Sequence, residues 1–167
     1  MTQVQKTRSM PAVGPGASAM RRLLISLGML ALAAVASVDA AHAADKGVSV
    51  HDPWMRFIVP MRPAAGYFTL NNDTAKSVVL VGAQSPACGM LMLHRSEQKN
   101  GVDSMSMVDK VPVPAHGTVK FAPGGYHLMC TDPKAEMAPG HSVPVTLRFA
   151  DGNSLTTSFP VRGPGGK

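Results

Sequence analysis

The sequence has few of the residues on which most enzyme active sites depend. Only two of its 167 residues are glutamate, Glu97 and Glu136, so a pair of carboxylates for acid–base chemistry has little material. No Ser-His-Asp or Cys-His arrangement stands out either. We therefore expect that the protein is not an enzyme.

Long apolar runs are also missing. The longest one, residues 23–38, has sixteen residues, whereas a helix across a bilayer needs about 20. It follows Arg21 and Arg22 and precedes the small-residue stretch Ala41-His42-Ala43, which is the pattern of a secretory signal. We expect cleavage after Ala43, export, and no stable membrane insertion of the mature protein.

The chain has no block of like charge. Its formal net charge is +6, but residues 44–167 carry 12 lysines and arginines against nine acidic residues, which leaves +3 spread along the chain. This pattern has no basic patch for nucleic acid. After residues 1–43, an N-terminal extension with its signal peptide, we expect one domain over residues 44–162 and a disordered tail at 163–167.

Helical periodicity is absent beyond residue 47, where short apolar runs alternate with Pro, Gly, Asn and Asp. Such a pattern predicts an all-β, antiparallel sandwich or barrel. We expect nine strands, at residues 48–57, 65–70, 77–83, 89–94, 104–108, 118–121, 126–131, 143–149 and 155–161.

The sequence is rich in methionine, with twelve residues, and has six histidines. Four of these residues, His94, Met105, His127 and Met129, give two imidazoles and two thioethers, a soft and uncharged donor set that suits Cu(I). Zinc favours thiolate or carboxylate ligands, and calcium favours oxygen. His127 and Met129 are two residues apart on an expected strand, so they should share one face.

The segment between His94 and Met105 contains Asn100-Gly101, a strong signal for a β-hairpin turn. A two-residue turn centred there would place Met107 directly opposite His94 and Met105 on the diagonal. Diagonal neighbours lie about 7–8 Å apart, within reach of a long side chain. Met107 is therefore an alternative to Met105 as a ligand.

The spacing His94, ten residues, Met105, twenty-one residues, His127-Leu128-Met129 resembles the motif of the PCuAC family of periplasmic copper chaperones. Flanking stretches such as Ala64–Asn71 and Pro123–Tyr126 also resemble family landmarks, and the similarity spans Val48 to Val161. The resemblance implies a cupredoxin-like Greek-key sandwich that binds one Cu(I) through the four motif residues.

The same resemblance implies a location and a set of partners. A protein of this family would work in the periplasm and deliver Cu(I) to a respiratory copper site during cytochrome c oxidase assembly. Its partner would be a copper-accepting oxidase subunit or an assembly factor of that oxidase. We expect the protein to be a monomer.

The two cysteines, Cys88 and Cys130, allow two interpretations. In an oxidising compartment an even pair tends to form a disulfide. It would close a loop of roughly 40 residues and stabilise the fold by about 3–4 kcal/mol in the chain-entropy model. A free Cys130 thiolate would instead favour a cupredoxin-type electron-transfer protein. A metal-free secreted β-sandwich that serves as an interaction module is a third possibility.

Several other side chains are predicted to pack in the core. Met90 and Met92 share the strand parity of His94, yet methionine is a common gap-filler in apolar packing, so core packing is the expected role. Trp54, the single tryptophan, is also expected to fill the sandwich core. Stacking of Trp54 against the metal ligands is the alternative.

Overall fold

A computed structural model describes residues 47–166, which form ten β-strands and no helix. The all-β prediction is therefore confirmed. The strands are β1 (Val48–Arg56), β2 (Ala64–Asn72), β3 (Val78–Gln84), β4 (Met90–Lys99), β5 (Val102–Met107), β6 (Val111–Val113), β7 (Gly117–Phe121), β8 (Tyr126–Thr131), β9 (Ser142–Phe149) and β10 (Ser154–Arg162).

The predicted signal peptide and its cleavage site lie outside the described residues. Within residues 47–166 there is no helix of the length and apolar character that a membrane span requires.

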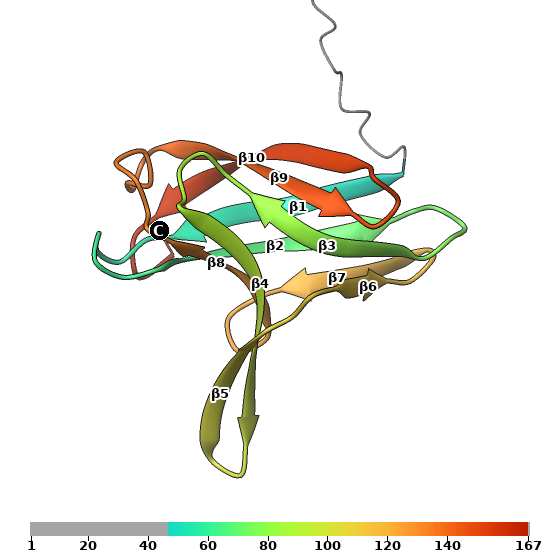
Figure 1. Ribbon diagram of the computed structural model, residues 1–167, viewed down its shortest axis with the longest axis horizontal. Coiled ribbons are helices and arrows are strands. Elements are labelled where there is room, and N and C mark those ends of the chain that lie inside the picture. The colour runs from blue at the N-terminus through green and yellow to red at the C-terminus, as the bar shows by residue number, and fades with distance from the viewer. Residues whose placement is uncertain (1–46, 167) are drawn as a thin grey trace, which may run out of the picture. The chain divides into compact units, whose positions relative to one another are not determined.

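The strands are hydrogen-bonded in the order β5-β4-β8-β7-β2-β1-β10-β9-β3-β6, with β8 also pairing β2 (Figure 1). The sheet folds back on itself between β1 and β10. These two strands pair in parallel over a short stretch, in which Met55 lies opposite Val161. Strands β9, β10 and β3 thereby cover β1, β2 and β8, and Phe68 of β2 meets Phe159 of β10 edge-on at 5.7 Å. The result is a sandwich around one apolar core.

Strand alternation decides which side chains enter this core. On β4, Leu91 and Leu93 are buried, and on β8, Leu128 and Cys130 are fully buried. The residues between them point to the opposite, outer face of the sheet, because successive side chains of a strand alternate. His94 on β4 and His127 and Met129 on β8 belong to this outer set.

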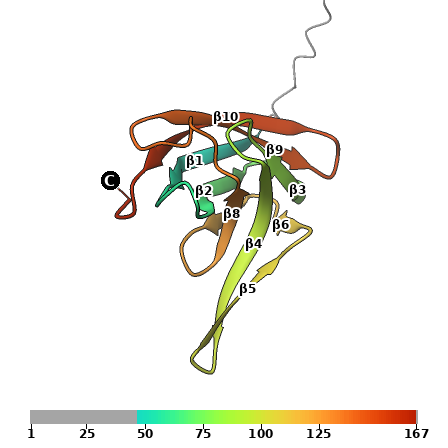
Figure 2. The same ribbon diagram turned by 60° about the vertical axis from the view of Figure 1, so that its left-hand side comes forward.

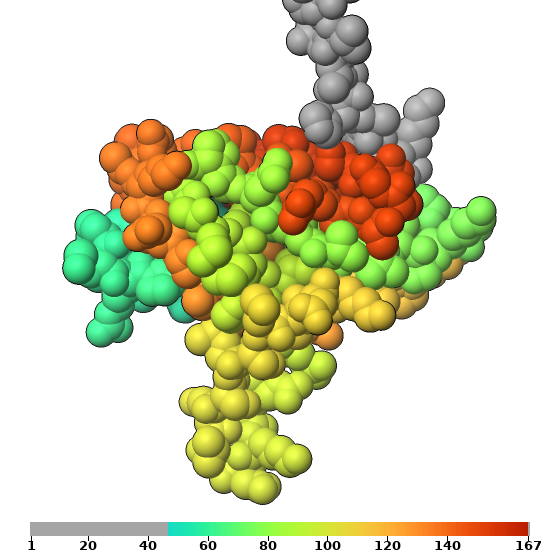
Figure 3. All heavy atoms as spheres, viewed as in Figure 1, coloured from blue at the N-terminus to red at the C-terminus, as the bar shows by residue number. Residues whose placement is uncertain are grey.

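The β4–β5 hairpin extends away from the other strands (Figures 2 and 3). Its turn is Asn100-Gly101, and both residues have positive φ, 54° and 78°, as a two-residue hairpin requires. The predicted turn is confirmed, but the predicted strand ends were wrong, since β4 continues to Lys99 and β5 begins at Val102. Both faces of the distal hairpin are exposed, so its residues need not alternate between apolar and polar. Its polar sequence therefore resembled that of a loop.

Strand β6 was missed because Pro112 lies at its centre. Proline lacks the amide proton that an interior strand must donate, and is tolerated at the edge of a sheet. Strand β6 is such an edge, with Pro112 opposite Val79 of β3. Val111 and Val113 on either side are buried in the core.

Candidate metal centre

The two motif histidines face each other across neighbouring strands. His94 of β4 pairs directly with His127 of β8, and their ring centroids are 5.8 Å apart. His127 is buried, whereas His94 is half-buried. Segments 33 residues apart in the sequence thus bring two imidazoles to one point on the outer face.

The hydrogen bonding of His127 determines which of its nitrogens is free. Its Nδ1 lies 3.1 Å from the carbonyl oxygen of Gly125, and a carbonyl only accepts, so Nδ1 carries the proton and donates it. In the neutral ring Nε2 is then left with a lone pair. That lone pair faces the Sδ atom of Met105 at 3.2 Å. In this neutral tautomer neither atom has a proton to give the other, so both are electron-pair donors that converge on one point.

The ring of His94 is also available to a metal. Its Nδ1 is buried and has no hydrogen-bond partner among the described residues. Burial, with the neighbouring His127 as a second cause, lowers the pKa of His94 below its usual value of 6.5. The ring is therefore neutral at neutral pH, the form in which imidazole binds metals.

The methionines of the hairpin take up the positions expected from the turn. Met107 lies directly opposite His94, and Met105 lies opposite Ser96, two residues further towards the hairpin tip. Met105 reaches back to His127, as the distance above shows. Both methionines are exposed, Met105 at 57% and Met107 at 62%.

Met129 is the fourth predicted ligand. It lies two residues after His127 on β8, on the same face, and is half-buried. Met105, His127 and Met129 all line one cavity of about 330 Å³ that is open to solvent. Residues 47–166 contain no cluster of three or more His, Cys, Asp or Glu side chains suited to a metal. The donors that lie beside His127 in this cavity are the thioether sulfurs of Met105 and Met129.

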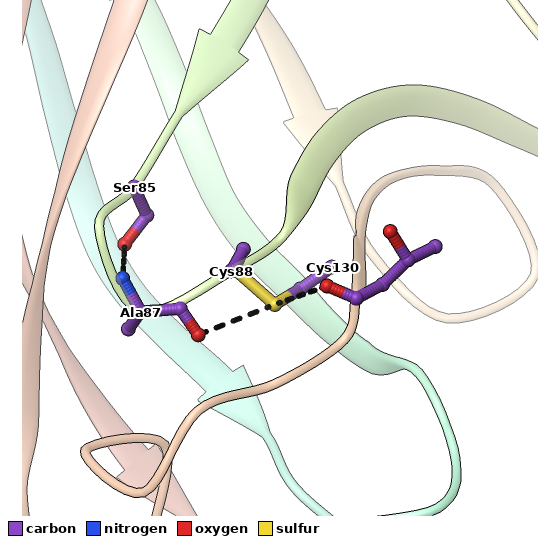
Figure 4. The surroundings of a disulfide bond; sticks show 5 residues. Ser85, Ala87, Cys88 and Cys130 are labelled. Atoms are coloured by element: carbon purple, nitrogen blue, oxygen red, sulfur yellow. Dashed lines mark hydrogen bonds between the residues drawn. A yellow bond between two sulfur atoms is a disulfide. The ribbon is translucent and has the colours of Figure 1, made fainter.

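A disulfide joins Cys88, just before β4, to Cys130 of β8 (Figure 4). Cys130 is fully buried and points into the core, away from the histidines. Its sulfur is not a free thiolate, so the electron-transfer alternative with Cys130 in the copper shell is not compatible with this structure. The bond links the strand of His94 to the strand of His127 and Met129.

Trp54 is not a core residue, and that prediction is wrong. It is half-buried on the outer face, with its ring centroid 4.9 Å from that of Tyr67 and the guanidinium of Arg162 over it at 5.3 Å. Tyr67 is in turn 6.5 Å from His127. The described part of the tail packs here as well, since Gly166 lies against the Trp54 ring.

Met90 and Met92 are likewise outside the core. Met90 is 60% exposed, and Met92 is half-buried opposite Met129. The sequence held one signal for this arrangement, because both residues share the parity of His94. The preference of methionine for apolar packing argued against it and was misleading here.

Comparison with known proteins places the chain in a family. Residues 48–161 match the family described as "Putative lipoprotein LpqE-like". The chain belongs to the LpqE-like family. This LpqE-like protein is 34% identical over 117 residues to "Putative lipoprotein Lxx21020" of Leifsonia xyli subsp. xyli, and the match covers 70% of each chain.

Two of the solved structures that the chain resembles are described as copper-bound. The copper-bound PCuAC domain from PmoF2 superposes with a TM-score of 0.59 at 22% identity, covering 71% of this chain and 94% of that one. The solution structure of CuI-DR1885 from Deinococcus radiodurans has a TM-score of 0.55 at 30% identity, covering 74% and 85%. The LpqE-like protein therefore has the cupredoxin-like fold of PCuAC domains.

Proposed function

We propose that this protein is an exported copper chaperone that carries one Cu(I) ion, bound by His94, Met105, His127 and Met129. The observation that carries the proposal is the approach of His127 Nε2 to the Met105 sulfur at 3.2 Å, where the neutral ring, protonated at Nδ1, presents a lone pair. A soft cation gives both atoms an acceptor for their electron pairs.

The donor set explains how copper could be held and still be released. Uncharged thioethers lack the electrostatic attraction of a thiolate for Cu(I), and their polarizable sulfur favours the reduced ion. Met105 is exposed on a hairpin, so an incoming donor atom can replace it while the two imidazoles keep the ion. Transfer would then be a stepwise ligand exchange.

The family and the fold support a proposal for the cellular role. Membership of a family described as lipoproteins supports an exported protein, and we place it in the periplasm. The similarity to CuI-DR1885 at 30% identity supports Cu(I) as the cargo. We propose that the recipient is a copper-accepting subunit of a respiratory oxidase, or an assembly factor of cytochrome c oxidase.

The test is an anaerobic Cu(I) titration followed by X-ray absorption at the copper edge. We expect one copper ion per protein, with nitrogen and thioether sulfur in its first shell. Replacing both site histidines, H94A with H127A, should abolish this binding. Replacing the exposed loop histidines, H116A with H141A, should leave it unchanged. Full binding by the first double variant would overturn the proposed ligand set. Absence of Cu(I) binding by the unaltered protein would overturn the chaperone proposal and favour a metal-free interaction module.

A further inference from the structure

The cavity beside the metal ligands has a second side that the ligands do not use. Strand register aligns Arg56 of β1, Ala65 of β2 and Met129 of β8 in one row across the sheet. Because Ala65 in the middle is small, it leaves a hollow between the arginine and the methionine. Arg62, from the loop after β1, lines the same cavity.

This side of the cavity carries positive charge without an acidic partner, although the guanidinium of Arg56 lies over the Tyr67 ring at 5.4 Å. The Nε atom of Arg56 is buried and has no hydrogen-bond partner among the described residues. The one ion pair within residues 47–166 joins Arg95 to Glu97, so neither Arg56 nor Arg62 has a carboxylate within 4 Å. No acidic side chain lines the cavity.

Binding of Cu(I) would increase the excess of positive charge in the cavity. Two imidazoles and two thioethers are uncharged, so Cu(I) would add a full positive charge to a cavity that already contains two guanidinium groups. Like charges repel one another, and the repulsion is stronger away from bulk water. An anion in the cavity would offset this repulsion.

We propose that the cavity binds a carboxylate group beside the copper ion, held by Arg56 and Arg62. A guanidinium presents a planar fork of donors that matches a carboxylate. The remaining lining, which includes Ile58, Pro63 and Pro123, is largely apolar. That lining suits a carboxylate with a hydrocarbon stem, either a small dicarboxylate or the acidic side chain of a copper-exchange partner, better than a hydrated inorganic anion.

The first test measures binding to the copper-free protein by titrating glutarate. We expect saturable NMR shifts of the Arg56 Nε–H and the Met129 methyl group. Arg56→Gln and Arg62→Gln should each weaken binding at least about tenfold, because a charge-assisted contact is lost. Arg148→Gln, which removes the same charge from an exposed site on β9, should not. Since Arg62 is exposed, its variant keeps the test valid if Arg56→Gln fails to fold.

Further ligands separate the chemical classes. Glutaramide, which is uncharged, should not bind, and chloride or phosphate should bind more weakly than glutarate. Equal binding of chloride, or an unchanged glutarate affinity in Arg62→Gln, would overturn the proposal. A short peptide with glutamate beside methionine that competes at lower concentration than glutarate would assign the carboxylate to a protein partner, and equal competition would assign it to a small molecule.

The link to copper rests on the proposed function and has its own measurement. Glutarate should bind more tightly to the Cu(I)-loaded protein, and glutarate should raise copper affinity by the same factor, because coupling is reciprocal. If copper does not bind the four ligands, the copper-free titration still decides the carboxylate site. If copper binds but glutarate does not, the carboxylate proposal alone fails.

Discussion

The Nε2 atom of His127 lies 3.2 Å from the sulfur of Met105, although the two residues are 22 positions apart in the sequence. Met107, which lies two residues further along β5 on the same face, is opposite His94 instead. The hairpin register thus gives each histidine a methionine neighbour. It therefore distinguishes Met105 from Met107, which the turn sequence alone did not.

We expect Met105→Leu to weaken Cu(I) binding roughly tenfold to a hundredfold, since a thioether facing the free nitrogen is removed without much change in volume. Met107→Leu, at a similarly exposed position on the same strand, should change affinity by less than about threefold. Competition with a chromophoric Cu(I) chelator measures both. The reverse order of effects would make Met107 the ligand.

Acidification should destabilise the copper-free protein through His94. Its pKa is lowered by burial in the folded state, so the unfolded chain binds the proton more readily. The stability due to the neutral ring is fully present above pH 6.5 and is lost as the pH falls through that value towards the folded pKa. Denaturant unfolding at pH 7.5 and pH 5 measures the change. His94→Gln should show a smaller difference between the two pH values, and an unchanged difference would contradict the assignment.

Removal of the disulfide should lower the free energy of unfolding by about 4 kcal/mol, because the bond closes a loop of 42 residues in the unfolded chain. The double variant C88A/C130A avoids a new hydroxyl in the core, where Cys130 is fully buried. Denaturant unfolding of the copper-free protein provides the measurement. Copper should still bind, since neither sulfur faces the histidines. Loss of copper binding in a folded variant would show that the sulfurs belong to the site.

Gly66 on β2 is a steric requirement beneath the site. A Cβ there would lie 2.9 Å from the sulfur of Met55 and 3.1 Å from the Cβ of Leu128. We expect Gly66→Ala to cost roughly 1–3 kcal/mol of stability by overpacking. Gly125→Ala is the matched control, as its nearest contact is 3.7 Å away. A thermal unfolding comparison decides, and equal melting temperatures would contradict the packing argument.

The strands could be predicted from the sequence because their signals are local. The alternation of apolar and polar residues along a strand depends only on neighbouring positions. The same is true of a turn such as Asn100-Gly101, where both residues have positive φ. The predictions failed where a distant partner decided the outcome. Pro112 is acceptable only because β6 is an edge strand, and Met90 is exposed because none of residues 47–166 covers its side chain at the start of β4.

The motif spacing likewise indicated which side chains to consider as ligands, since residue type and parity are properties of the chain. It did not show which nitrogen of His127 is free, which methionine lies beside it, or that Arg56 and Arg62 line the same cavity. These depend on the register between β4, β5 and β8 and on the approach of β1, which bring together groups far apart in the sequence. Contacts between such segments depend on how all the strands pack together, so the tertiary structure alone decides them.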